Sequence, residues 1–120
     1  MASRDLTGYR LGWEKERMRE KQALRNRHER AMTQARVAGE HLKQKYGCRV
    51  FLYGSIIDEE RFLDHSDIDM AISDLGVEVD FWVVYSEVMK ILHPFGFDLV
   101  ELERIEAEVR DHILQKGVEV

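Results

Sequence analysis

The spacing of apolar residues predicts a long helix near the start of the chain, from about residue 13 to residue 46. This stretch holds no Pro and is rich in Glu, Lys, Arg, Gln, Ala and Met, the residues that lose least on entering a helix. Apolar residues recur in it at spacings of three, four or seven, at Leu24, Ala31, Ala35, Ala38, Leu42 and Tyr46. The stripe predicts that the second half of the helix packs on a core.

Polar residues dominate the other side of this helix and its first half. Arg25, Arg27, Arg36 and Lys43 fall between the apolar positions and are predicted to face outward. Before Leu24 the apolar pattern thins. The first half is therefore expected to project past the domain or to be held by another subunit.

Three shorter segments have the pattern of β-strands. Residues 49–53 form a β-branched and aromatic run that ends at Gly54, as is typical of a buried strand. Residues 66–72 alternate between apolar and polar positions, and so do residues 97–102. An alternation with period two predicts strands with one face toward the core.

Helices are predicted between and after these strands. Residues 55–63 read as a turn and a short helix with Ser55 near its start, and residues 79–92 form an amphipathic helix closed by Pro94. A last helix is expected over residues 105–117. The order of elements predicts an α/β or α+β fold, with helices packed on one small mixed sheet of three to five strands.

Length and composition place the chain among globular proteins. Its 120 residues suit one folding unit, with residues 1–34 as a helical extension and residues 35–120 as the domain. With 44% hydrophobic and 34% charged residues it differs from disordered chains, and no apolar run approaches the roughly 20 residues of a bilayer span. The first ten residues lack a basic segment followed by an apolar run. The single cysteine, Cys48, is expected to be a buried hydrophobe, and a cytoplasmic protein is predicted.

Charge is divided unevenly along the chain. Residues 1–49 hold 13 Lys and Arg against 6 Asp and Glu, a net charge of +7, whereas residues 50–120 hold 5 against 17, a net charge of −12. A basic face suits an acidic partner or nucleic acid, and an acidic region suits metal ions. Ordinary solvated faces are the alternative. Aromatic residues are not interleaved with the basic ones, so nucleic-acid binding by the basic helix remains a minor option.

Two carboxylates, Asp67 and Asp69, stand two residues apart on a predicted strand and therefore point the same way. Ionised carboxylates so close together repel each other unless a hard cation such as Mg²⁺ lies between them. Asp98 opens the next alternating strand, and it completes the cluster if the two strands are neighbours. Three carboxylates match the two-metal arrangement that serves phosphoryl transfer.

A candidate phosphate site follows the first strand at Gly54 and Ser55. Glycine permits a close approach, the serine hydroxyl can donate to a phosphate oxygen, and the start of a following helix adds N–H donors and a favourable dipole. Alone, either Gly-Ser or Asp-x-Asp is more often a turn or a helix cap than a catalytic site. The combination of the two motifs is what discriminates.

That combination resembles a known pattern. A strand ending in Gly54-Ser55, then Ser-Asp-Ile-Asp-Met at residues 66–70, then Phe-Asp-Leu-Val at residues 97–100 is similar to the Gly-Ser, Asp-x-Asp and distal-Asp motifs of the polymerase-beta-like nucleotidyltransferase superfamily. The resemblance runs from about residue 35 to the end of the chain. It is closest to the minimal nucleotidyltransferases, known as MNT domains, which are encoded beside HEPN proteins and in many cases act as their antitoxins. Residues 111–118 are similar to the end of those domains.

The resemblance implies a palm-like nucleotidyltransferase fold and a two-metal site. It implies metal-binding and catalytic roles for Asp67, Asp69 and Asp98, with Asp98 also a candidate base, and nucleotide-binding roles for Gly54, Ser55 and Ser66. Ser66 has the alternative of only orienting its loop. The implied reaction moves AMP from ATP, with two Mg²⁺ ions, to an acceptor hydroxyl. The implied partner is a HEPN-type protein, and a homo-oligomer is the alternative, since so short a chain must borrow its acceptor surface.

The chain departs from the family pattern directly after Ser55. Many relatives continue with a small residue, an arginine and a glycine, whereas residues 56–61 here read Ile-Ile-Asp-Glu-Glu-Arg. The acidic residues 58–60 should weaken nucleotide binding unless they face away or Arg61 compensates. The departure leaves open a second reading, a degenerate module that neutralises its partner by binding alone. His65 could touch a phosphate but fits an exposed loop, and no histidine has zinc spacing with a cysteine.

Overall fold

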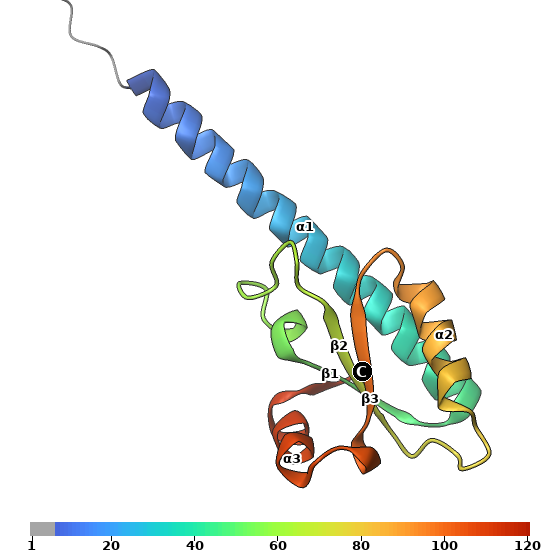
Figure 1. The fold of residues 1–120 in the computed structure, drawn as a ribbon. Helices are drawn as coiled ribbons and strands as arrows, with labels where there is room; N and C mark the ends of the chain where they lie inside the picture. The colour runs from blue at the N-terminus through green and yellow to red at the C-terminus, as the bar shows by residue number, and fades with distance from the viewer. Residues whose placement is uncertain (1–6) are drawn as a thin grey trace, which may run out of the picture.

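A four-stranded mixed sheet forms the centre of the domain in this computed structural model, which describes residues 7–120 (Figure 1). The helices and strands are α1 (Thr7–Tyr46), β1 (Arg49–Tyr53), η1 (Gly54–Ile57), β2 (Ile68–Ser73), α2 (Phe81–Leu92), β3 (Phe97–Glu101), η2 (Leu102–Arg104), α3 (Ala107–Lys116) and β4 (Val118–Glu119). Here η marks a 3-10 turn. The predicted mixed fold of helices on one small sheet is confirmed, with β4 as a strand that the sequence analysis missed.

The strand order in the sheet is β3-β2-β1-β4. Strand β1 pairs antiparallel with β2 on one side and with β4 on the other, while β2 and β3 run parallel. Parallel neighbours begin at the same edge of a sheet, whereas an antiparallel neighbour ends there. The starts of β2 and β3 therefore meet the end of β1 at one edge.

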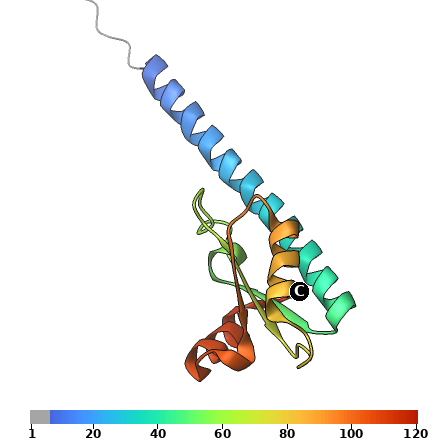
Figure 2. The same cartoon turned by 45° about the vertical axis from the view of Figure 1, so that its right-hand side comes forward.

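Helices cover both faces of this sheet. Helices α1 and α2 lie on one face, and the short helix α3 lies on the other (Figures 1 and 2). The alternation predicted for β2 is confirmed, because Ile68, Met70 and Ile72 are fully buried against α1 and α2. Ala71 points to the opposite face, where it packs with Ile113 of α3. Asp69 shares this second face by the period of the strand.

Helix α1 is one continuous element of 40 residues, and it begins earlier than the pattern predicted. Its second half packs through small and apolar residues that are fully buried, at Ala31, Ala35, Ala38 and Leu42. Residues 8–23 are all exposed, and this projecting segment extends well beyond the domain. The structure is therefore elongated, with principal extents of 79 × 29 × 18 Å for the part of the chain that it describes.

The end of α1 is set by Gly47. Its backbone has a φ of +67°, a left-handed conformation that glycine adopts without steric cost, and its N–H donates to the Lys43 carbonyl at 2.9 Å. The chain then turns into β1. Cys48 lies at this turn, buried as expected, and burial is the main reason that the pKa of its thiol is raised.

Candidate functional site

The register of the sheet brings the predicted aspartates to one edge. Asp69 in β2 lies directly beside Asp98 in β3, and its partner on the other side is Tyr53, the last residue of β1. Asp67 comes one residue before β2 begins. The condition set by the sequence, that the two aspartate-bearing strands are neighbours, is therefore met.

Two glycines make room for the carboxylates of this edge. Gly54 has a φ of +75°, and a Cβ atom placed on it would overlap the carboxylate of Asp69. A Cβ atom on Gly96 would overlap the carboxylate of Asp67 in the same way. Any larger residue at either position would displace an aspartate. The role of Gly96 was not predicted from the sequence, although its place one residue before the third strand was a usable signal.

The aspartates impose an unfavourable field on one another. Burial raises the pKa of the half-buried Asp69, and the nearby charges of Asp98 and Asp67 raise it further. Burial together with Asp69 and Asp98 raises the pKa of Tyr53 to about 12. Within residues 7–120 none of the three carboxylates forms an ion pair with Lys, Arg or His. The site therefore concentrates negative charge without a protein cation to balance it.

Such a donor set suits a hard divalent cation, because carboxylate oxygens are the ligands that Mg²⁺ prefers. In the part of the chain that the structure describes, however, no three His, Cys, Asp or Glu side chains converge tightly enough to enclose a metal as they stand. The aspartates thus have the ligand chemistry that Mg²⁺ prefers, and they lie near one another. Holding the ion would require their side chains to rotate toward a common point.

Gly54 and Ser55 lie in η1, a single 3-10 turn of four residues. The N–H of Asp58 donates back to the Ser55 carbonyl at 3.0 Å, which closes the turn. The expected dipole of a following helix is therefore limited to one turn. Ser55 itself is only half-buried and lies beside the edge that carries Asp69.

The Ser66 hydroxyl is engaged in contacts within its own loop. Its hydroxyl oxygen accepts a hydrogen bond from the Leu63 N–H at 2.8 Å and lies 3.5 Å from the Arg61 carbonyl. These contacts support the simpler of its two predicted roles, that of orienting the loop before Asp67. A phosphate contact by the same hydroxyl would compete with them.

The acidic run after Ser55 is partly neutralised within the molecule. The Asp58 carboxylate accepts a hydrogen bond from the Glu60 N–H at 3.1 Å, and Glu59 pairs with Arg25 of α1 at 3.3 Å. Glu59 is thus drawn toward α1. Arg25 was predicted to face outward, and its ion pair with Glu59 could not be predicted from the helical pattern alone.

Arg27 was predicted to face outward from the helix, and this prediction is wrong, because its side chain contacts two loops of the site. Its Nε donates to the Leu63 carbonyl at 3.1 Å and its Nη2 to the Ser66 carbonyl at 2.9 Å. Its guanidinium also lies over the rings of Phe62 and Phe95, at 5.3 and 4.9 Å from their centroids. Arg27 therefore joins the two loops that lead into the first and third aspartates.

His28 connects α1 to the Gly54-Ser55 turn. Its Nε2 lies 2.7 Å from the Ile56 carbonyl, and its ring meets Phe62 edge-on with the centroids 5.6 Å apart. Helix α1 thereby holds all three segments that form the site edge. The signal was present in the sequence, since His28 falls three residues before Ala31 on the buried stripe and Arg27 lies beside it.

The chain matches no protein-family model, no curated protein and no solved structure. Its function is therefore inferred from the residues of the site.

The remaining candidates contribute nothing to this edge. His65 is exposed, 3.7 Å from the neighbouring Asp64 carboxylate, as expected of a loop histidine.

Across residues 7–120 no helix is both long enough and apolar enough to cross a membrane.

Proposed function

We propose that this chain is a Mg²⁺-dependent nucleotidyltransferase of the MNT type, with a palm-like fold, that transfers AMP from ATP to an acceptor hydroxyl. The observation that carries the proposal is the parallel pairing of Asp69 with Asp98, next to Gly54 and with Asp67 one residue before the strand. Three unbalanced carboxylates beside a glycine turn suit a metal-bound triphosphate.

In this proposal Asp67 and Asp69 would hold the two Mg²⁺ ions, with Asp98 as a further ligand. When bound, the ions would supply positive charge near the attacking and leaving oxygens. Asp98 accepts the proton of the acceptor hydroxyl, whose oxygen bonds to the α-phosphorus. The bond from that phosphorus to the bridging oxygen breaks, and pyrophosphate leaves. Gly54 and Ser55 would contact the triphosphate, with the Ser55 hydroxyl donating to a phosphate oxygen.

The partner in this proposal is a HEPN-type protein that carries the acceptor hydroxyl. The support is the resemblance of the sequence motifs, together with the small size of the domain. Residues beyond the sheet and its three helices are few, so no second domain in the described chain could bind an acceptor.

Thermal unfolding with Mg²⁺ and each of the four nucleoside triphosphates is the first test. The proposal expects ATP and Mg²⁺ together to raise the melting temperature, because a ligand that binds only the folded state stabilises it. Asp69→Asn should abolish this rise and leave the chain folded. Asp64→Asn is a matched control, since Asp64 is an exposed acid in the adjacent loop and should behave as the wild type.

Transfer is tested by mass spectrometry of the purified partner after incubation with the chain, ATP and Mg²⁺. The expected product is an adenylylated partner. If Asp98 is the base, Asp98→Asn should lower the rate of adenylylation at least about a hundredfold. The degenerate binding module predicts a different result. Asp69→Asn would then neutralise the partner as effectively as the wild type does, and neither protein would yield a modified product. The acidic residues Asp58 to Glu60 are the feature that favours that alternative.

A further inference from the structure

The projecting segment, residues 8–23 of α1, is a helix without a partner in its own chain. All of its residues are exposed, including the large apolar side chains of Tyr9, Leu11, Trp13 and Met18, which are 51 to 70% exposed. Isolated helices of about this length are only marginally stable in water. Tyr9 and Trp13 stand one turn apart and line the same face of this helix, where they form an exposed aromatic pair suited to contact with another surface.

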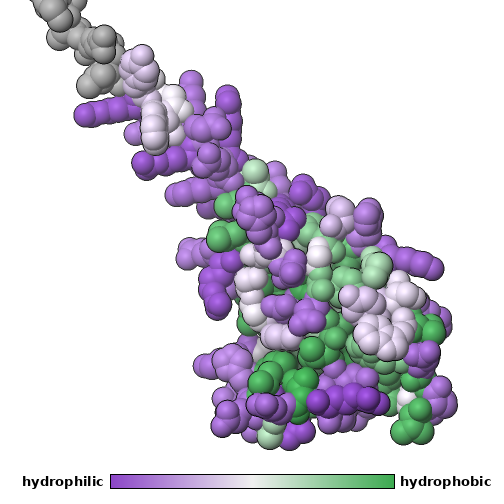
Figure 3. Space-filling model, viewed as in Figure 1, coloured by the Kyte–Doolittle hydropathy of each residue, from purple (hydrophilic) through white to green (hydrophobic). Residues whose placement is uncertain are grey.

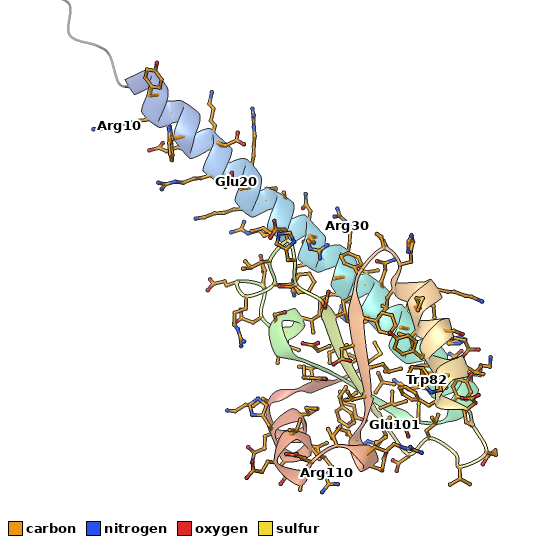
Figure 4. The ribbon with its side chains drawn as sticks, in the orientation of Figure 1. Arg10, Glu20, Arg30, Trp82, Glu101 and Arg110 are labelled. Atoms are coloured by element: carbon orange, nitrogen blue, oxygen red, sulfur yellow. The ribbon has the colours of Figure 1, made fainter. Side chains whose placement is uncertain are left out.

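A surface of suitable shape lies at the opposite end of the domain. An open groove of about 910 Å³ runs between the segment before α2 and the end of β3. Its apolar lining includes Val79, Leu99 and Ile105, and Trp82 at the start of α2 is 68% exposed beside it. Figure 4 shows Trp82 and Glu101 at this end, far from Arg10 on the projecting segment.

Charge distinguishes the two surfaces. Four acidic residues line the groove, Asp74, Asp80, Glu101 and Glu103, against one basic residue, Arg104. The projecting segment, residues 8–23, carries 5 Lys and Arg against 3 Asp and Glu. Figure 3 shows the projecting helix as mostly hydrophilic, while apolar side chains gather on the domain. An apolar groove with an acidic rim thus matches a basic helix that carries exposed aromatic side chains.

The groove of the same chain is out of reach. Helix α1 packs along the domain from about residue 27 to residue 46, where Tyr46 bonds to Glu87 of α2, and the groove lies past that end. The projecting segment leaves the domain at the other end, as Figures 1 and 2 show. Only the groove of a second molecule is available to it.

The lengths allow a closed pair. At a rise of about 1.5 Å per residue, the projecting segment is about 24 Å long and the packed half of α1 about 30 Å. If two α1 helices run antiparallel about a two-fold axis near residue 30, residue 13 of one copy lies beside residue 46 of the other. Tyr9 and Trp13 then reach the groove of the second copy, and the exchange is reciprocal, as two-fold symmetry requires.

We infer that two copies of this chain form a two-fold dimer in which the projecting helix of each copy lies along the domain of the other and inserts Tyr9 and Trp13 at its acidic groove. This inference is independent of the proposed function. It assigns an occupant to both exposed apolar surfaces at once.

Light scattering at about 100 μM chain and low salt tests the dimer. The wild type should have twice the monomer mass of 14.2 kDa. Trp13→Ala and Trp82→Ala should each weaken association at least tenfold, because exposed aromatic anchors dominate such interfaces. Leu114→Ala on α3 is the matched control and should remain dimeric, since Leu114 is similarly apolar and 47% exposed but lies on the other face of the sheet. A monomeric wild type overturns the inference, and so does a Trp82→Ala variant that dimerises like the wild type.

Zero-length carbodiimide cross-linking between isotopically labelled and unlabelled copies locates the contact. The expected product joins Lys15 of one copy to a groove acid of the other, such as Glu103. Links from Lys15 that stay within one copy, or that join two projecting segments and never reach the groove, contradict the arrangement. Trp13 and Trp82 are both exposed in the single chain, so the melting temperature of the isolated monomer should change little in either variant.

Discussion

The two halves of α1 share one helix but differ in what holds them. Both are rich in helix-forming residues, and the backbone is helical from Thr7 to Tyr46. The second half has a stripe of small buried residues that packs on the sheet and α2, whereas residues 8–23 are all exposed. Helix propensity therefore accounts for the element, while packing determines which half supports the candidate site.

The sharpest contrast between the halves is expected in stability. Leu42→Ala in the packed half should lower the free energy of unfolding by about 3 kcal/mol, because Leu42 is fully buried and the substitution leaves a cavity. Arg19→Ala in the projecting segment should change it by less than about 0.5 kcal/mol. Urea unfolding followed by circular dichroism measures both. Equal effects of the two changes would contradict the division of the helix.

The junction between the halves is tested at Arg27. Arg27→Ala removes two hydrogen bonds to loop carbonyls and two contacts with aromatic rings, at an expected cost of about 2 kcal/mol. If the proposed site binds nucleotide, the same change should also reduce the stabilisation by ATP and Mg²⁺, because the loops before the aspartates lose their anchor.

Arg30→Ala serves as the control for this position, since Arg30 is exposed on the next turn of the same helix. Arg30→Ala should leave the free energy of unfolding and the stabilisation by ATP and Mg²⁺ near the wild-type values. Arg27→Lys should recover little, because an ammonium group cannot bridge two carbonyls with the planar geometry of a guanidinium. Full recovery by lysine would show that charge alone is sufficient.

The far end of the packed half is tested through pH. Hydrogen bonds from Lys45 and Tyr46 of α1 lower the pKa of Glu87 in α2 from 4.5 to about 2. A lowered pKa in the folded state gives stability that is present above pH 4.5 and is lost as the pH falls toward 2. Glu87→Gln should therefore cost about 1 kcal/mol at pH 7 and much less at pH 3. Urea midpoints at the two pH values measure the difference, and an equal cost at both would exclude the ionised contact.

The smallest effect is expected at the site that the packed half supports. The pKa of Asp69 is raised in the folded chain, so its ionised form is disfavoured there, and the penalty appears as the pH rises through the ordinary aspartate range. With a chelator present, Asp69→Asn should therefore raise the urea midpoint slightly at pH 7 and leave it unchanged at low pH. A fall at pH 7 would indicate that the ionised carboxylate is favourably bound in the metal-free protein.

Much of the fold followed from the sequence because it depends on local patterns. The periods of 3.6 and 2 located all three helices and the three longer strands. The alternation in β2 predicted that Ile68, Met70 and Ile72 share one face, but not that α3 buries Ala71 on the other. The short strand β4 was missed, since two residues carry too little pattern to distinguish them from a chain end.

For the candidate site, the motifs in the sequence identified the available side chains, namely Asp67, Asp69 and Asp98 with the Gly54 turn. Their proximity depends on the folded sheet, because strand register places Asp69 against Asp98 across 29 residues of chain. The same holds for Arg27, which the periodicity placed outside and which long-range hydrogen bonds bring to the loops. The hydrophobic pattern indicates which face of a helix or strand the core will bury, whereas a long-range polar contact depends on partners that meet only once the chain has folded.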